Sequence, residues 1–198
     1  MLDTTGELAP LRVLLDALVQ ARPPWLQLRW KNAAGGPLLE LACEVVQRAA
    51  AAGCRVIVND RLDVALASGA AGVHLGQDDL PLDAARRVAG DRLVIGVSTH
   101  DVAEARAAED GGADYVGFGP MFPTTSKADA LTPRTLDGLR AVRAAIRIPI
   151  VAIGGIGPAS AHAILDAGAD AVAMISALAT SPDPTELCAR ILALPRRT

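Results

Sequence analysis

A chain of 198 residues that is 51 % hydrophobic is long enough to bury one sizeable core, so we expect a single domain over residues 1–198. The net charge of −3 comes from interspersed basic and acidic residues, which excludes a broad binding surface for nucleic acid or anionic membrane. The three cysteines are scattered without a Cys-x-x-Cys pair, which excludes a disulfide framework and a zinc site. No apolar run approaches the roughly 20 residues of a membrane span, and we expect a cytoplasmic protein.

Short apolar strands alternate with Ala-rich amphipathic helices along the chain. The predicted helices are Leu8–Leu18, Leu38–Ala51, Leu62–Ala67, Leu82–Val88, Val102–Glu109, Leu136–Ala144, Ala159–Leu165 and Pro184–Leu194. The predicted strands are Trp25–Arg29, Arg55–Val58, Gly72–Leu75, Leu93–Gly96, Tyr115–Phe118, Ile150–Ile153 and Ala171–Met174. This alternation predicts a parallel sheet. Because polar residues follow nearly every strand, a closed TIM (β/α)8 barrel accounts for the pattern better than an open sheet.

The first strand of such a barrel is truncated in this chain. Met1–Thr5 precedes the first helix and is too short for a full strand, so either a stub fills that position or the expected strand lies upstream. An empty position would leave backbone groups of the neighbouring strands unpaired, at a cost of about 1–3 kcal/mol each. We therefore predict that Met1–Thr5 pairs with at least one neighbouring strand.

Two acidic residues, Asp60 and Asp79, follow consecutive predicted strands. The loops after parallel strands all open on one face of a barrel, where enzymes of this fold carry out their chemistry. A pair of carboxylates at that face suits Mg²⁺, which also binds substrate phosphates. The alternative is that each Asp caps the helix that follows it, since Asp is a favoured cap residue.

Cations and hydroxyls follow several other strands. The period-2 spacing of Gln27, Arg29 and Lys31 directs them to the same side of one strand, where Arg and Lys suit a pyrophosphate. Ser98 follows another strand, and the loop after Tyr115–Phe118 contains three hydroxyl residues and Lys127. The alternatives are an exposed cation pair and an ordinary surface loop.

Glycines precede a helix after the seventh predicted strand, in the run Ile153-Gly154-Gly155-Ile156-Gly157, and Ile175-Ser176 follows the eighth. Backbone N–H groups at such a helix start bind anions, and this is the usual phosphate site of the barrel class; a purely structural turn is the alternative. Two anion sites at one barrel mouth imply two phosphorylated small-molecule substrates. His74 and His162 are expected to be structural, whereas a role for His100 is left open.

These residues together resemble the thiamine phosphate synthase family. The resemblance runs from about Trp25 to Leu194, on the motifs Gln27-x-Arg29-x-Lys31, Asn59-Asp60-Arg61, His74-Leu75-Gly76-Gln77-Asp78-Asp79, Gly96-Val97-Ser98, Thr124-x-Ser126-Lys127 and Ala152-Ile153-Gly154-Gly155-Ile156. It implies an enzyme that joins a hydroxymethylpyrimidine pyrophosphate to a thiazole phosphate, giving thiamine phosphate and pyrophosphate.

The resemblance also implies a role for each matching residue. Mg²⁺ would be held by Asp60 and Asp79. The catalytic groups around the leaving pyrophosphate would be Arg29, Lys31, Ser98 and Lys127. The pyrimidine substrate would meet the run Gln27, Leu28, Arg29, Trp30 and Lys31, together with Asn59. The thiazole phosphate would be held by Thr124, Thr125, Ser126, Gly155, Ile175 and Ser176.

The implied mechanism is dissociative: pyrophosphate leaves, a pyrimidinylmethyl cation forms, and the thiazole nitrogen captures it. Such chemistry needs charge stabilisation rather than a nucleophile, and the sequence presents no Ser-His-Asp arrangement. Two alternatives stay open. One is a thiazole tautomerase, a related branch that tends to lose the metal carboxylates and the Gly-Gln-x-Asp motif; the other is a barrel that binds a thiamine-related phosphate without turnover. The oligomeric state is open, with a homo-oligomer possible.

Overall fold

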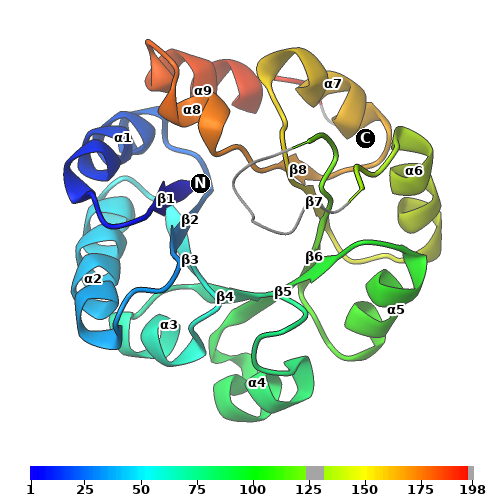
Figure 1. Ribbon diagram of the computed structural model, residues 1–198, viewed down its shortest axis with the longest axis horizontal. Helices are drawn as coiled ribbons and strands as arrows, with labels where there is room; N and C mark the ends of the chain where they lie inside the picture. The colour runs from blue at the N-terminus through cyan, green and yellow to red at the C-terminus, as the bar shows by residue number, and fades with distance from the viewer. Residues whose placement is uncertain (124–131, 196–198) are drawn as a thin grey trace.

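The computed structural model describes residues 1–123 and 132–195. The described residues form one eight-stranded sheet in which the strands follow chain order and every neighbouring pair is parallel. The strands are β1 (Leu2–Thr4), β2 (Trp25–Trp30), β3 (Arg55–Asn59), β4 (Gly72–Leu75), β5 (Val94–Thr99), β6 (Tyr115–Phe118), β7 (Ile150–Ala152) and β8 (Ala171–Val172). The sheet curls into a ring with the helices outside it (Figure 1). The prediction of a TIM-like barrel is confirmed.

All the predicted helices are present. They are α1 (Leu8–Ala21), α2 (Gly35–Ala51), α3 (Leu62–Ser68), α4 (Leu82–Ala89), α5 (Val102–Asp110), α6 (Leu136–Ala145), α7 (Pro158–Asp166) and α9 (Pro184–Leu192); the four-residue α8 (Ser176–Ala179) and the 3₁₀ turn Gly90–Arg92 were not predicted. The last helix ends two residues earlier than expected, because Pro195 disfavours helical geometry in the residue before it. No helix in the described part of the chain is long and apolar enough to cross a membrane.

The truncated first strand occupies its position in the barrel. In β1, Leu2 pairs with Leu28 of β2, and Asp3 pairs with Arg29. On the other side, the amino group of Met1 donates a hydrogen bond to the Met174 carbonyl at 2.9 Å, just beyond β8. The stub therefore contacts both neighbours, and the prediction that it pairs with at least one is confirmed.

The eighth strand is shorter than the predicted Ala171–Met174 and ends at Val172. A three-residue β1 offers it little backbone to pair with, and the strand pairings of the described residues include no ladder between β8 and β1. A cavity of about 610 Å³ extends from this side into the barrel interior, and its lining includes Met1, Leu26, Gln27, His74, Tyr115 and Met174.

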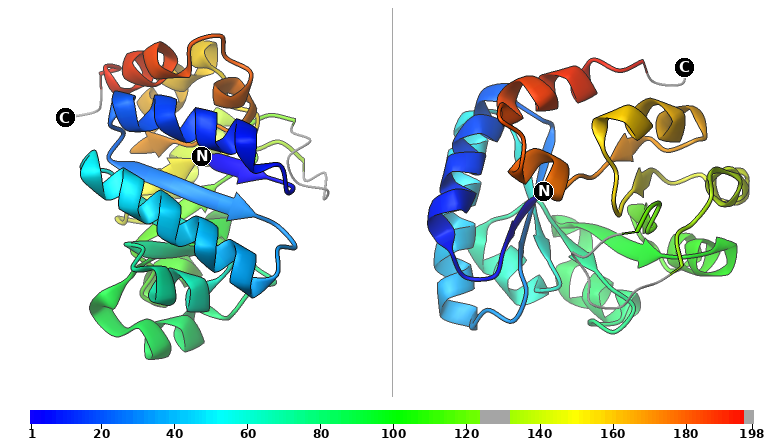
Figure 2. Two further views of the ribbon diagram at one scale, coloured as in Figure 1. Left: turned by 90° about the vertical axis from the view of Figure 1, so that its left-hand side faces the viewer. Right: turned by 45° about the horizontal axis from the view of Figure 1, so that its top comes forward.

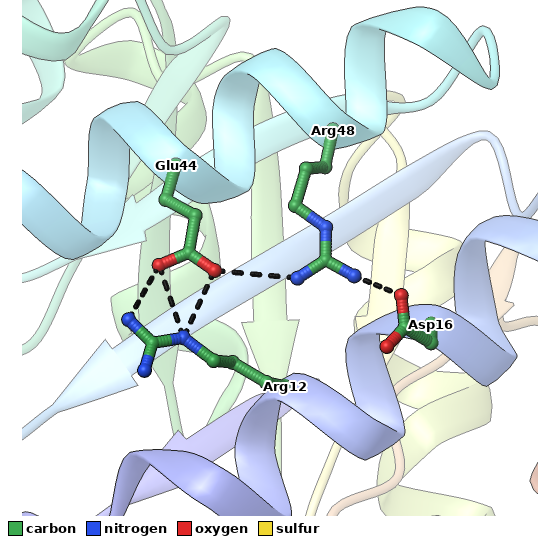
Figure 3. Close-up of polar contacts among 4 residues, drawn as sticks. All are labelled: Arg12, Asp16, Glu44 and Arg48. Atoms are coloured by element: carbon green, nitrogen blue, oxygen red, sulfur yellow. Dashed lines mark hydrogen bonds and ion pairs between the residues drawn. The ribbon is translucent and has the colours of Figure 1, made fainter.

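Helices α1 and α2 lie side by side on the outside of β1 and β2 (Figure 2), and a network of ion pairs joins them (Figure 3). The guanidinium of Arg12 donates to both carboxylate oxygens of Glu44, at 2.8 to 3.1 Å. Arg48 donates to Glu44 at 3.2 Å and also pairs with Asp16 of α1. The network therefore helps to fasten the helix that follows β1 to the rest of the barrel.

Glu44→Gln should lower the free energy of unfolding by about 1 kcal/mol at pH 7, as expected for a partly exposed network. The hydrogen bond from Arg12 lowers the pKa of Glu44 below its ordinary value of 4.5. A carboxylate with a depressed pKa stabilises the fold above its unfolded-state pKa, and this contribution is lost as the pH falls through the folded-state value. The difference between wild type and Glu44→Gln should therefore shrink below about pH 4.5.

Urea unfolding at pH 7 and at pH 3 measures this difference. The control is Arg140→Gln, which removes a pair between two well-exposed side chains, Arg140 and Asp137. It should leave the free energy of unfolding nearly unchanged at both pH values. An equal loss in Glu44→Gln at both pH values would contradict the assignment.

Candidate active site

The two predicted metal carboxylates lie at neighbouring strand ends. Asp60 directly follows β3, and its N–H donates to the His74 carbonyl of β4 at 2.7 Å. Asp79 follows β4, and its Oδ2 accepts the N–H of Gly76 at 2.6 Å. Helices α3 and α4 have Arg61 and Pro81 at their N-caps, without a side-chain cap. The alternative that both Asp residues are helix caps is therefore wrong.

Asp60 has a left-handed backbone, with φ of 65°. Asp and Asn tolerate this conformation better than other residues with a Cβ, and it still costs on the order of 1 kcal/mol. Strain of this kind is concentrated at functional sites, where the surrounding structure holds it in place. The backbone at the end of β3 is thus unusual, although Arg22 and Asn32 also have positive φ.

The donor set fits Mg²⁺. This ion commonly takes one or two carboxylates, keeps several waters and binds substrate phosphates. Within residues 1–123 and 132–195, no group of three or more His, Cys, Asp or Glu side chains is placed to hold a metal. Asp60 and Asp79 supply the two carboxylates that such an ion can take, one at each of two neighbouring strand ends.

The residues of β2 do not alternate strictly in burial: Leu26, Leu28 and Arg29 are buried, whereas Gln27 and Trp30 are half-buried. Gln27 donates to the Asn59 side chain of β3 at 2.7 Å, which joins two of the predicted substrate-binding residues. Leu28 is fully buried in the hydrophobic core, so only its backbone is available to a substrate. Trp30 packs against the core, and Lys31 is exposed just beyond the strand.

Arg29 forms a partly buried ion pair that the sequence analysis missed. Its Nη1 lies 2.7 Å from Oδ1 of Asp3, and the two side chains are 11 % and 17 % exposed. The pair follows from strand register, since Asp3 of β1 lies opposite Arg29 of β2. Asp3 thus holds the guanidinium at the mouth. Its place in the predicted stub strand was the only sequence signal for this contact.

Ser98 is held from two directions near the end of β5. Its carbonyl accepts the side-chain amide of Gln77 at 2.5 Å, and its hydroxyl lies 2.9 Å from Nε2 of His74. The other ring nitrogen of His74 lies 3.0 Å from the Tyr115 hydroxyl. Gln77, His74 and Tyr115 were not predicted as site residues, although the first two belong to the motif around Asp79.

The other two histidines lie outside this cluster. The backbone N–H and Nδ1 of His100 both contact Oε2 of Glu104 at 2.8 Å, which ties His100 to the first turn of α5. His162 is exposed on α7 and lies near Asp166. His100 thus contacts the helix that follows it, and its role stays open.

The predicted second anion site lies across the ring, at β7 and β8. Gly154 and Gly155 both have positive φ, 88° and 62°. The β6 loop packs on this turn, because Met121 and Phe122 donate to the carbonyls of Ile153 and Gly154 at 2.9 and 3.1 Å. Gly155 is exposed, Ile175 is the N-cap of α8 and Ser176 is its exposed first residue. The remaining predicted residues, Thr124, Thr125, Ser126 and Lys127, lie outside the described residues.

Comparison with known proteins identifies the family of this chain. Residues 4–178 match the family model described as thiamine monophosphate synthase. The chain belongs to that family. The thiamine-phosphate synthase of Chloroflexus aurantiacus is 46 % identical over 92 % of this chain and 84 % of its own length. That of Methanocella arvoryzae is 52 % identical over 85 % of this chain and 80 % of its own.

The solved structures give the same result. A thiamine phosphate pyrophosphorylase from Pyrococcus furiosus superposes with a TM-score of 0.82 at 34 % identity, covering 91 % of this chain and 90 % of that one. A 3-hexulose-6-phosphate synthase, at 19 % identity and a TM-score of 0.73, shares the fold. The prediction of a thiamine-phosphate synthase, a transferase, is confirmed.

Proposed function

We propose that this chain joins a hydroxymethylpyrimidine pyrophosphate to a thiazole phosphate, releasing pyrophosphate and giving thiamine phosphate. The observation that supports this most is the placement of Asp60 and Asp79 at neighbouring strand ends, with the pinned residues Arg29 and Ser98 on the strands to either side. A separate glycine turn follows β7. Charge-stabilising groups and a second anion site are what a reaction between two phosphorylated substrates needs.

The leaving group would be stabilised from several directions. Asp60 and Asp79 would hold Mg²⁺, which when bound supplies positive charge against the pyrophosphate. Arg29 would contact the pyrophosphate through two N–H groups of its guanidinium, and Lys31 through its compact ammonium charge. Lys127 and the Ser98 hydroxyl would be further donors. Because Asp3 fixes the Arg29 guanidinium before substrate arrives, that charge needs little reorganisation during the reaction.

The two organic groups would be held on opposite sides of the reacting bond. Gln27 and Asn59, already hydrogen-bonded to each other, would bind the pyrimidine. The thiazole phosphate would be bound by Thr124, Thr125, Ser126, Gly155, Ile175 and Ser176. The chain supplies no covalent nucleophile in this scheme. The bond to pyrophosphate breaks first, and the thiazole nitrogen then captures the pyrimidinylmethyl cation.

Two other functions fit the fold less well. A thiazole tautomerase would not need the carboxylate pair or the Gly76–Asp79 segment, both of which this chain keeps. A barrel that binds its ligand without turnover would be expected if the first-strand position beside β2 were empty. In this structure β1 occupies that position. We also propose a cytoplasmic location, since Cys43, Cys54 and Cys188 are all free thiols.

Pyrophosphate release should require both substrates and Mg²⁺. A coupled assay that detects pyrophosphate, with chromatography of thiamine phosphate, measures this directly. A chelator should abolish turnover, and excess Mg²⁺ should restore it. Turnover that is unchanged by the chelator would refute the metal assignment. Isomerisation of a thiazole phosphate without any pyrimidine substrate would favour the tautomerase instead.

A further inference from the structure

A chain of three polar side chains crosses the barrel interior beneath the mouth. The Tyr115 hydroxyl of β6 lies 3.0 Å from Nδ1 of His74 on β4. Nε2 of the same ring lies 2.9 Å from the Ser98 hydroxyl of β5. The Tyr115 and His74 rings lie at an angle of 32°, with centroids 5.6 Å apart. One end of the chain is thus a residue of the proposed pyrophosphate site.

Two glycines make room for these rings. A Cβ added at Gly96 would lie 2.0 Å from the Tyr115 ring, and one at Gly117 would lie 2.8 Å from Cε1 of His74. Real Cβ atoms essentially never approach this closely, so any larger residue at these positions would displace the rings. The two glycines therefore leave the space in the barrel interior that the Tyr115 and His74 rings occupy.

The remaining freedom of Ser98 is the rotation of its hydroxyl. Its backbone is fixed by the β5 ladder and by Gln77, and the residue is only 3 % exposed. A hydroxyl has one proton to donate and lone pairs to accept with. If Ser98 donated its proton to His74, that proton would not be available to an anion.

Donation from the Tyr115 hydroxyl to Nδ1 of His74, which the 3.0 Å contact allows, would give the opposite polarity. Burial raises the pKa of the Tyr115 phenol, so its hydroxyl keeps its proton. When the phenol donates to Nδ1, the neutral imidazole carries its proton on Nε2, because the bond at one ring nitrogen determines the tautomer at the other. Nε2–H then donates to Ser98, and the serine proton is left to point elsewhere.

We propose that Tyr115 and His74 are positioning residues that turn the Ser98 hydroxyl proton toward the leaving pyrophosphate. The inference rests on the proposed function for the identity of that anion. Tyr115 and His74 would not contact the substrate themselves. They would determine whether the Ser98 hydroxyl, which does contact it, can donate a hydrogen bond to it. Substitutions at Tyr115 or His74 should therefore change activity only when the Ser98 hydroxyl is present.

A double-mutant cycle tests this coupling. Tyr115→Phe removes the hydroxyl and keeps the ring, and it should lower kcat by about 10-fold, somewhat less than the loss of a direct donor in Ser98→Ala. In the Ser98→Ala background, Tyr115→Phe should have no further effect. The KM for the thiazole phosphate should stay unchanged throughout. Additive losses would mean that Tyr115 acts by supporting the fold, and would overturn the proposal.

Two further variants sharpen the result. His74→Gln keeps an N–H that can donate to Ser98 and should retain more activity than His74→Leu, which keeps none. Thr99→Val removes a neighbouring buried hydroxyl that lies 3.5 Å from the Gly117 carbonyl, and its kcat should match the wild type. Equal losses in His74→Gln and His74→Leu would overturn the proposal.

The same cycle can be measured without turnover. Calorimetry with magnesium pyrophosphate as the probe should show the loss of affinity in Tyr115→Phe and its disappearance in the Ser98→Ala background. An inactive wild-type protein would refute the proposed function, while the calorimetric cycle would still decide the role of Tyr115. Unchanged pyrophosphate affinity in Tyr115→Phe, together with unchanged kcat, would refute the positioning role itself.

Discussion

Replacing Asp60 with asparagine should slow thiamine phosphate formation by about 10²-fold or more, the loss expected for a main electrostatic group. The substitution removes one metal carboxylate at the end of β3 while keeping the size of the side chain. Asn also tolerates the φ of 65° that Asp60 adopts, so the backbone should not change. Alanine would mix the loss of charge with backbone strain.

Steady-state kinetics at several Mg²⁺ concentrations measure the effect. Asp79→Asn should behave similarly, because its amide oxygen can still accept the Gly76 N–H while the charge is lost. The matched control is Asp78→Asn, an exposed neighbour of the same type, which should keep its activity. If Asp60→Asn were fully active in the presence of a chelator, the metal assignment would be wrong.

Gly155→Ala should weaken thiazole phosphate binding by at least about 10-fold and lower the free energy of unfolding by roughly 1–3 kcal/mol. A Cβ at this position would lie 2.7 Å from the Pro123 carbonyl oxygen and 2.8 Å from Cβ of Phe122. The turn and the β6 loop would have to move apart.

Gly53→Ala is the control that separates the effect of backbone strain from the effect of a steric clash at the added Cβ. Gly53 also has positive φ, 77°, but a Cβ there would meet nothing within 4 Å. It should therefore lose stability without losing affinity. Calorimetry on both variants with thiazole phosphate and with pyrophosphate measures the difference. If Gly155→Ala lost only pyrophosphate affinity, the assignment of the two anion sites would be inverted.

Local sequence patterns were enough to predict the elements of the barrel. Short β-branched runs located β3 and β4, and Gly at the helix ends located the turns between them. The period-2 spacing of Gln27 and Arg29 predicted one face of β2, although Arg29 is itself buried like Leu28. The eighth strand was predicted too long because its length depends on β1, which lies at the opposite end of the chain.

Contacts between strands could not be predicted in the same way. The Asp3–Arg29 pair depends on register, which no local pattern encodes. The direction of His74 was undetermined because all four residues of β4 are buried, so the strand has no polar face to set the alternation. The space for its ring comes from Gly117 of β6, and the space for the neighbouring Tyr115 ring comes from Gly96 of β5. These contacts involve residues far apart in sequence and require the folded barrel.

The ion pair between Asp3 and Arg29 makes the activity depend on one of the shortest strands of the barrel. Asp3 belongs to a strand of three residues that has a ladder with β2 alone. Segments with so few hydrogen bonds open at a lower free energy than the rest of a domain. Fraying of β1 would remove the counter-charge of Arg29 while the other strands stayed paired. On heating, catalysis should therefore fail at a lower temperature than the helical circular dichroism signal, so that inactivation precedes global unfolding.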